Sequence, residues 1–217
     1  MPRHLEKRRA RSADDKELRR RAIVESARRL LSLALDLRLE DVARGAGVAK
    51  PSLFRYFRNK EELVLEVYLL ELEEITARLA GALVGVRHAG TQEIARALAA
   101  ILVAHPLFVR LTTSVHTVLA RRISVEAARR FKLALLAQLT ASAGALETLL
   151  PSLPPGSGLT LLVRFHAVVS GLWQLADHAP SVAAAIAGGG LDLFRVDFAH
   201  EVEHVFAALL RDQEVES

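Results

Sequence analysis

Residues 39–63 read LEDVARGAGVAKPSLFRYFRNKEEL, and this stretch interrupts long segments dominated by Leu and Ala. It places Gly45 and Gly47 ahead of a proline at position 51 and a cluster of aromatic and basic side chains. Glycine ends helices at low cost because it adopts positive φ, and proline suits the first turn of the next helix. The stretch therefore predicts two short helices joined by a tight turn, with positive φ at Gly47.

The second of these helices, which starts near Pro51, has an apolar face and a polar face. Leu53 and Phe57 are four residues apart, so we expect them to pack inward together with Val48. The outward positions are left to Lys50, Ser52, Arg55 and Tyr56. Lys and Arg bond guanine edges, and Ser and Tyr bond phosphates, when a helix-turn-helix places its second helix in the major groove. The alternative is a three-helix domain with an ordinary basic surface.

The segments around this motif complete a predicted three-helix domain at residues 13–59. Before it, residues 1–12 are rich in arginine and are predicted to be a disordered basic arm, with Ser12 capping a first helix that runs to about residue 33. After it, Asn59 and Glu62 form a capping-box pattern at the start of a long helix. Lys60 lies in the first turn of that helix, where an ammonium group and backbone N–H groups together favour a phosphate.

Charge is distributed unevenly along the chain. Residues 1–60 hold 17 Lys and Arg against 8 Asp and Glu, a balance of +9, whereas residues 61–217 carry a balance of −5. A basic N-terminal domain on a mildly acidic remainder indicates a polyanionic partner. A solvated helix face is the alternative that charge alone leaves open.

The rest of the chain, residues 60–217, is predicted to be an all-α domain, with helices at roughly 60–83, 91–104, 106–119, 124–150, 159–178, 181–187 and 191–211. The chain contains no cysteine, which excludes disulfides and cysteine-ligated metal. No uninterrupted apolar run reaches the roughly 18 residues of a membrane span, and the basic N-terminus lacks the apolar segment of a secretory signal. We therefore expect a cytoplasmic protein without a membrane partner.

The segment VARGAGVAKPSLFRYFRNKEEL resembles the helix-turn-helix of the TetR family of bacterial transcriptional regulators. The positions in register are Val42-Ala43, Ala46-Gly47-Val48, Leu53-Phe54, Tyr56-Phe57, Asn59-Lys60 and Leu63. This resemblance covers about residues 18–68. It implies DNA binding, with Lys50, Pro51, Ser52 and Arg55 at positions that touch bases or the adjoining backbone. By the same resemblance Tyr56 and Lys60 grip phosphates, and Arg44 is a further backbone contact.

The chain departs from the family pattern at three places. Ala49 stands where a serine usually caps the second helix of the motif, and Arg38 stands where a threonine commonly caps the first, which leaves Asp36 as the nearest substitute. The turn LALDLRL also lacks the usual glycine. A lost cap costs up to about 2 kcal/mol, so these departures concern how the motif docks and leave the fold intact.

The resemblance also implies that the larger helical domain binds a small molecule and forms a homodimer through its last two long helices. An apolar pocket with a few polar groups is expected near Phe108, Thr112, His116, Phe165, His166 and Trp173, with His105 as a further candidate. His166 and Trp173 are seven residues apart on one predicted helix and so share a face. Each of these residues is also a reasonable core or surface residue.

The segment His200-Glu201-Val202-Glu203-His204 matches the HExxH pattern of zinc metalloproteases. A catalytic zinc needs a third protein ligand, and only Asp212, Glu214 and Glu216 follow within the last 13 residues. The apolar stripe of this helix lies on its other side, so two solvent-facing histidines are the better interpretation. We therefore predict no enzymatic activity, no cofactor and no metal site.

Together these features predict a DNA-binding transcriptional regulator, a repressor released from a near-palindromic operator by a small apolar ligand. The main alternative is a constitutive regulator without an effector. The sequence leaves open the operator, the effector and the choice between repression and activation.

Overall fold

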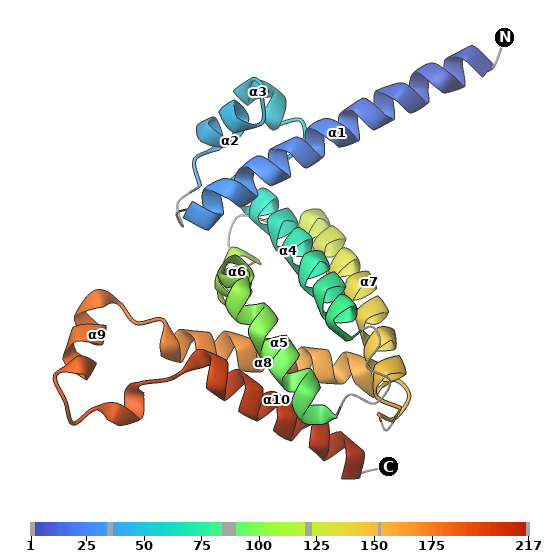
Figure 1. The fold of residues 1–217 in the computed structure, drawn as a ribbon. Coiled ribbons are helices and arrows are strands. Elements are labelled where there is room, and N and C mark those ends of the chain that lie inside the picture. The colour runs from blue at the N-terminus through green and yellow to red at the C-terminus, as the bar shows by residue number, and fades with distance from the viewer. Residues whose placement is uncertain (1–2, 34–36, 84–89, 120–122, 152, 216–217) are drawn as a thin grey trace. The chain divides into compact units, whose positions relative to one another are not determined.

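The computed structural model describes residues 3–33, 37–83, 90–119, 123–151 and 153–215, and every regular element in these ranges is a helix (Figure 1). The all-α prediction is confirmed. The chain divides into two compact units: a first unit of Met1–Val67 with Val118–Ala128, and a second unit of Tyr68–Thr117 with Arg129–Ser217. The division falls after Val67, inside helix α4 (Lys60–Leu83), whereas the predicted domain boundary was the start of that helix.

Helix α1 (Arg3–Leu33) belongs to the first unit and begins earlier than predicted. Residues 3–12, which the sequence predicted to lie in a disordered arm, are part of this helix. The segment consists largely of Arg, Lys, Glu, Leu and Ala, which favour helix, and it contains no Gly or Pro after residue 2. Ser12 is therefore an interior residue of the helix and does not cap it. Ile23, Ala27 and Leu31 form the buried face of α1.

Helix α2 (Leu39–Gly45) is held against α1 by a close approach. The hydroxyl of Ser26, a residue that is 2% exposed, donates a hydrogen bond to the carbonyl of Val42 over 3.0 Å. A Cβ atom at Gly45 would collide with that hydroxyl, so glycine is required for this contact. Gly47 follows with a φ of 65°, which confirms the predicted turn.

Helix α3 (Lys50–Leu53) is a single turn with Pro51 near its start, and the chain continues in turns to Phe57. The carbonyl of Leu53 accepts the N–H groups of Tyr56 and Phe57 at 2.9 and 3.0 Å. Leu53 is fully buried and Phe57 is 2% exposed, which confirms the predicted inward face. Neither α2 nor α3 has a side-chain cap at Arg38 or Ala49, as the departures from the family pattern indicated, and Asp36 lies outside the described residues.

Helix α4 begins at the predicted cap. The N–H of Glu62 donates to Asn59 Oδ1 over 2.9 Å, and the Glu62 carboxylate accepts the N–H of Arg58 at 3.3 Å. The capping-box pattern therefore forms, with the reciprocal bond shifted to Arg58. Leu63 and Val67, both fully buried, are the α4 residues that complete the first unit.

The second unit contains the remainder of α4 and the later helices. They are α5 (Thr91–Ala104), α6 (Pro106–Leu119), α7 (Val125–Leu149), α8 (Ser157–Ala176), α9 (Pro180–Ala187), the 3-10 turn η1 (Asp192–Phe194) and α10 (Phe198–Val215). Helices α6 and α7 each place one end in the first unit. The helix predicted at 191–211 is in fact η1 followed by α10. Asp197 Oδ1 accepts the N–H of His200 at 3.1 Å and so caps α10, which explains its later start.

Helices α8 and α10 lie side by side, and α10 also packs against α5, while α9 and η1 form a separate excursion between them (Figure 1). The core at this junction is built on Val202, Phe206 and Leu210, all fully buried. The rings of Phe165 and Phe206 stack with centroids 4.1 Å apart. Stacked aromatic rings therefore join α8 to α10.

By length and composition, α8 is apolar enough to cross a membrane, as are α5 and α6 taken together across an 86° bend. The core helix of a globular protein meets the same criterion, and α8 packs against α10 within the second unit. Only 17% of the apolar stretch of α8 is buried within the chain. Many of its other residues are half-buried, and the exposed ones include Val163 and Leu175.

Candidate functional site

The residues predicted to contact DNA gather around α3 in the first unit. Lys50, Pro51 and Arg55 are exposed, and Ser52 and Tyr56 are half-buried. Buried Leu53 and Phe57 anchor the opposite side of the same turns. Phe54, which the sequence analysis did not single out, is 45% exposed beside these polar groups. The local fold thus separates an apolar attachment face from an exposed polar face.

Two cations of this face are held by acids on α2. The Lys50 ammonium bonds the carboxylate of Glu40 across the glycine turn, and the pKa of Glu40 is lowered mainly by this hydrogen bond, with a backbone hydrogen bond and the charge of Lys50 adding to it. Arg44 Nη1 lies 3.0 Å from Asp41 Oδ1. The sequence analysis missed Glu40 because its pairing with Lys50 spans ten residues and follows no helical period.

Arg55 and Lys60 are exposed, whereas Arg20 contacts the buried ring of Phe57. Arg55 Nη2 donates to Ser52 Oγ over 3.2 Å, one turn of helix away, so both side chains stay on the exposed face. Arg20 of α1 lies 5.3 Å from the centroid of the Phe57 ring and 2.6 Å from Glu66 Oε1. Arg20 therefore braces the first unit. Lys60 is exposed in the first turn of α4.

The second unit contains a partly open cavity of about 300 Å³, lined by residues of α4 to α8 and α10. Its wall is mainly aliphatic, with Leu72, Ile75, Leu98, Leu102, Leu135 and Leu139 among the lining residues. Five of the six predicted ligand-binding residues line it, namely Phe108, Thr112, His116, Phe165 and His166. The volume is at the lower end of the range for ligand pockets, which is about 300–1,000 Å³.

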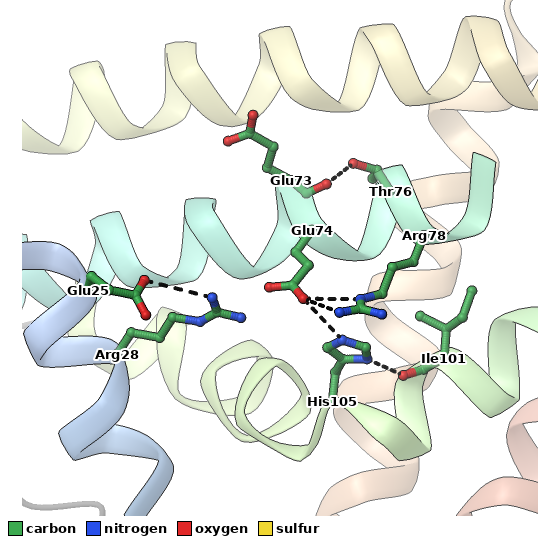
Figure 2. Close-up of polar contacts among 8 residues, drawn as sticks. All are labelled: Glu25, Arg28, Glu73, Glu74, Thr76, Arg78, Ile101 and His105. Carbon is green, nitrogen blue, oxygen red and sulfur yellow. Dashed lines mark hydrogen bonds and ion pairs between the residues drawn. The ribbon is translucent and has the colours of Figure 1, made fainter. Parts of the chain in front are cut away.

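The two other predicted candidates lie outside the cavity lining. Trp173 packs edge-on against Phe198 of α10, with ring centroids 5.2 Å apart. His105 caps the end of α5: its Nδ1 donates to the Ile101 carbonyl at 2.7 Å, and its Nε2 lies 3.7 Å from Glu74, which also pairs with Arg78 (Figure 2). His105 therefore has a structural partner on each side of its ring.

A connected group of polar side chains lies within the apolar cavity wall. The Tyr68 hydroxyl is 3.5 Å from His166 Nδ1, and His166 Nε2 is 3.2 Å from His116 Nε2. Burial raises the pKa of Tyr68 to about 12, against a smaller opposing effect of a hydrogen bond with Thr112. Burial also lowers the pKa of His166, and the nearby charges of His116 and Lys132 lower it further. Tyr68 was not predicted from sequence, where it looked like any inward residue of a long helix.

The HExxH segment does not assemble a metal site in the described part of the chain, which contains no group of three or more His, Cys, Asp or Glu suited to a metal ion. His200 and His204 are exposed, with ring centroids 6.3 Å apart. Glu203 instead accepts hydrogen bonds from Gln92 at 2.7 Å and Arg96 at 3.3 Å, both on α5. The segment therefore fastens α10 to α5.

A helix-turn-helix with an exposed basic face, together with a helical domain that contains an apolar cavity, is typical of DNA-binding transcription regulators. The model described as "Bacterial regulatory proteins, tetR family" matches residues 23–67, and "Tetracyclin repressor-like, C-terminal domain" matches residues 67–212. The chain belongs to the TetR family, whose members are DNA-binding regulators and have no enzymatic role. Regulators of this family bind DNA operators, dimerise and respond to small-molecule effectors.

Two solved structures share the fold. A protein described as a tetR family transcription regulator from Shewanella sp. PV-4 is 19% identical, with a TM-score of 0.52 over 89% of this chain and 97% of that chain. A tetR-family transcriptional regulator from Mesorhizobium loti MAFF303099 is 17% identical, with a TM-score of 0.52 over 91% of this chain and 96% of that chain. No curated protein sequence matches the chain significantly. At these identities the structural likeness concerns the fold alone.

Proposed function

We propose that this regulator is a cytoplasmic repressor whose homodimer binds a near-palindromic operator and is released by a small apolar ligand bound in the cavity of the second unit. The observation that carries the proposal is the apolar cavity of about 300 Å³ in a chain that also contains a helix-turn-helix. A DNA-binding domain alone would need no such cavity. A regulator without an effector would fill this space with side chains, because protein interiors are otherwise close-packed.

The exposed polar face of α3 is the proposed DNA-contacting surface. Lys50 and Arg55 are the candidates for base edges, with Pro51 and Ser52 beside them, while Tyr56, Lys60 and Arg44 would grip phosphates. Exposure of the side chains other than Ser52 and Tyr56, which are half-buried, supports this assignment, since base and phosphate contacts require groups that reach beyond the protein surface. The pairs Lys50–Glu40 and Arg44–Asp41 would have to open for both cations to contact DNA.

The proposed dimer would form through α8 and α10. Leu175 of α8 is 57% exposed and Val163 is 56% exposed, so part of the apolar surface of this helix is uncovered within one chain. A second copy packed against α8 would bury this surface, as obligate helical dimers do. The two helix-turn-helix motifs of such a dimer would contact two half-sites related by a two-fold axis.

To release the repressor from DNA, the ligand must bind one conformation of the dimer more tightly than another. A ligand with equal affinity for the DNA-bound and free forms would change nothing, whatever its affinity. Because α4 supplies Leu63 and Val67 to the first unit and Tyr68 and Leu72 to the second, a ligand-induced change at the cavity wall acts on the same helix that carries Lys60.

A selection of duplexes from a randomised pool, followed by fluorescence anisotropy over a salt series, tests the DNA-binding part of the proposal. Lys60→Ala is expected to weaken binding to all duplexes and to reduce the slope of log affinity against log salt by about one. Arg129→Ala removes the same charge from an exposed position of the second unit and serves as the control. An unchanged slope in Lys60→Ala would contradict its phosphate contact, and a protein without salt-sensitive affinity for any duplex would contradict the whole proposal.

Native mass spectrometry of the protein purified from cells separates the ligand-released repressor from a constitutive regulator. A bound apolar molecule that is lost on unfolding, and that lowers operator affinity when added back, is expected. Operator binding that no extracted small molecule alters would favour the constitutive regulator.

A further inference from the structure

Some polar groups that line the cavity donate hydrogen bonds to the backbone of their own helix, whereas others do not. Thr76 and Ser142 donate to carbonyls of their own helices, at 3.0 Å to Leu72 and 2.9 Å to Gln138. Thr112 likewise donates to the Phe108 carbonyl at 2.9 Å. These hydroxyls satisfy backbone acceptors, so they add little polarity to the cavity. The remaining capacity for hydrogen bonds belongs to Tyr68, His116, His166 and Lys132, which come from α4, α6, α8 and α7.

The two histidines share a single hydrogen between their facing nitrogens. With His116 Nε2 and His166 Nε2 at 3.2 Å, one nitrogen must donate and the other accept, so a fully protonated pair would oppose two N–H groups. The Tyr68 hydroxyl can donate to His166 Nδ1 or accept from it, according to which tautomer the pair adopts. Because His166 Nδ1 faces Tyr68 and the two Nε2 atoms face each other, the ring nitrogen that these contacts do not use is His116 Nδ1.

Lys132 carries a positive charge that no acid among the described lining residues balances. No Asp or Glu is found among the described residues that line the cavity, and the buried carboxyl of Glu71 on α4 lies outside the lining. Lys132 extends from α7 at 5.9 Å from the Phe131 ring centroid, and it has no ion-pair partner in the described part of the chain. Both Lys132 and His116 disfavour a proton on His166. The positive charge of Lys132, which is exposed beside the apolar lining, is therefore available to an anion.

We propose that the ligand is a small apolar acid, an alkyl or aryl carboxylate, whose carboxylate lies among Lys132, His116 and His166 and whose apolar part covers the aliphatic wall. This inference rests on the proposed ligand-released repressor and specifies the chemical class of its effector. A carboxylate would pair with the ammonium of Lys132 and accept a hydrogen bond from His116 Nδ1, while a proton taken up by the histidine pair would add positive charge beside it. Charge-assisted hydrogen bonds of this kind are stronger than those between neutral groups.

Binding of such an acid is coupled to proton uptake. Burial lowers the pKa of His166, and the nearby charges of His116 and Lys132 lower it further. Without a ligand, the imidazole is therefore neutral near pH 7. An anion beside it raises that pKa, while the ligand carboxylate, with an ordinary pKa of about 4, stays ionised. Tyr68 remains neutral throughout because its pKa is raised to about 12. Affinity is therefore expected to rise as pH falls from about 7.5 to about 6.

Titration calorimetry of the full chain without DNA tests this assignment, with decanoate, decanol and decylammonium as probes that differ only in their head group. Decanoate is expected to bind about tenfold more tightly than decanol, with decylammonium weakest. The heat of decanoate binding should vary with the ionisation enthalpy of the buffer in the direction of proton uptake. Lys132→Met and His166→Gln should lose the preference for decanoate and keep their affinity for decanol.

Arg129→Met is the matched control, because it removes one cation from the same helix at an exposed position outside the cavity lining. Thermal unfolding of each variant verifies that it is folded. Because Lys132 is exposed, Lys132→Met should disturb the fold less than His166→Gln. Equal affinity for decanol and decanoate, or a decanoate preference that survives both substitutions, would overturn the assignment of an acid. If decanol alone bound and released operator DNA, the repressor proposal would stand without the acid. If no probe bound, the acid would be excluded while DNA binding was judged by its own assay.

Discussion

The two units of the chain place their polar groups in opposite ways. In the first unit, Lys50 and Arg55 are exposed in front of a buried layer that includes Leu53 and Phe57. In the second unit, Tyr68 and His166 are surrounded by the apolar wall of a cavity. Exposed charges contribute little to the free energy of folding but much to association with a polyanion. The energy of polar groups within an apolar wall depends on their hydrogen-bond partners and on their pKa values. Polar side chains are therefore placed to meet a large partner in the first unit, and in the second they line a cavity that we propose binds a ligand.

The largest effect is expected from Phe206→Ala in the second unit. Phe206 is fully buried and stacks on Phe165, so the substitution should reduce the free energy of unfolding by about 3–5 kcal/mol. The chain has a single tryptophan, Trp173, which lies in the second unit and reports its unfolding by fluorescence during urea denaturation. A shift no larger than that of Ala208→Gly, a change at an exposed position of the same helix, would contradict this role.

The next effect is expected from Leu53→Ala, which removes a fully buried side chain behind α3 and should cost about 2–5 kcal/mol in the first unit. Helix loss followed by circular dichroism should then begin at lower urea concentration than the change in Trp173 fluorescence, and affinity for DNA should fall. Leu18→Ala, at a position that is 65% exposed, is the control and should change neither signal. Coincident transitions in Leu53→Ala would show that the two units unfold as one.

Lys50→Ala and Arg55→Ala are expected to alter sequence preference while the fold is retained. If either side chain contacts a base edge, its loss should cost about 1–3 kcal/mol at one base pair of the operator. Affinity measured for a set of operators with single base-pair changes distinguishes base contact from phosphate contact. A loss that is uniform over the whole set would assign the substituted residue to the backbone.

A smaller effect on the stability of the second unit is expected when the pH is changed. The pKa of His166 is lowered in the folded chain, so the unfolded chain binds more protons once the pH falls below its ordinary value of about 6.5. Stability of the second unit should therefore decrease as pH falls below about 6.5 and should be constant above it with respect to this group. The midpoint of the Trp173 transition in urea measures the effect. His166→Gln should flatten the dependence, and an equally steep dependence in that variant would rule out His166 as its source.

The smallest effect is expected from Glu40→Gln, which removes the carboxylate that pairs with Lys50. DNA affinity should increase a few-fold at low salt, because Lys50 no longer has to leave an acid before it contacts DNA, and the gain should shrink as salt screens the pair. Glu61→Gln, at the start of α4, removes an acid without a described contact to Lys50. An equal gain in both variants would indicate a general change in net charge.

The first unit could be predicted closely from sequence because its key residues act through local geometry. Positive φ at Gly47 and the inward spacing of Leu53 and Phe57 are fixed by backbone sterics and helical periodicity within a few residues. The early start of α1 was missed because basic composition suggested disorder, although the same residues favour helix. The pair Lys50–Glu40 was missed because it depends on how the turn folds back.

The cavity could be predicted only in part. Phe108 and His166 look the same in sequence whether they fill a core or line a cavity, since both situations require an inward side chain at helical spacing. A cavity arises where side chains from several helices fail to fill the space among them, and that depends on tertiary packing. Trp173 shares a helix and a spacing with His166, yet its ring packs on Phe198, outside the lining. A single-helix argument cannot determine which neighbour a large side chain meets.

The bond between Glu40 and Lys50 has a consequence for how such a protein would search a chromosome. A genome offers an immense excess of sequences that are not the operator, and all of them present the same phosphates. If Lys50 contacts DNA, the carboxylate of Glu40 would compete with every phosphate, which would shorten each chance encounter. At the operator, hydrogen bonds to bases would outweigh that competitor. An acid beside the contact surface would then exchange some affinity for faster sampling of the genome.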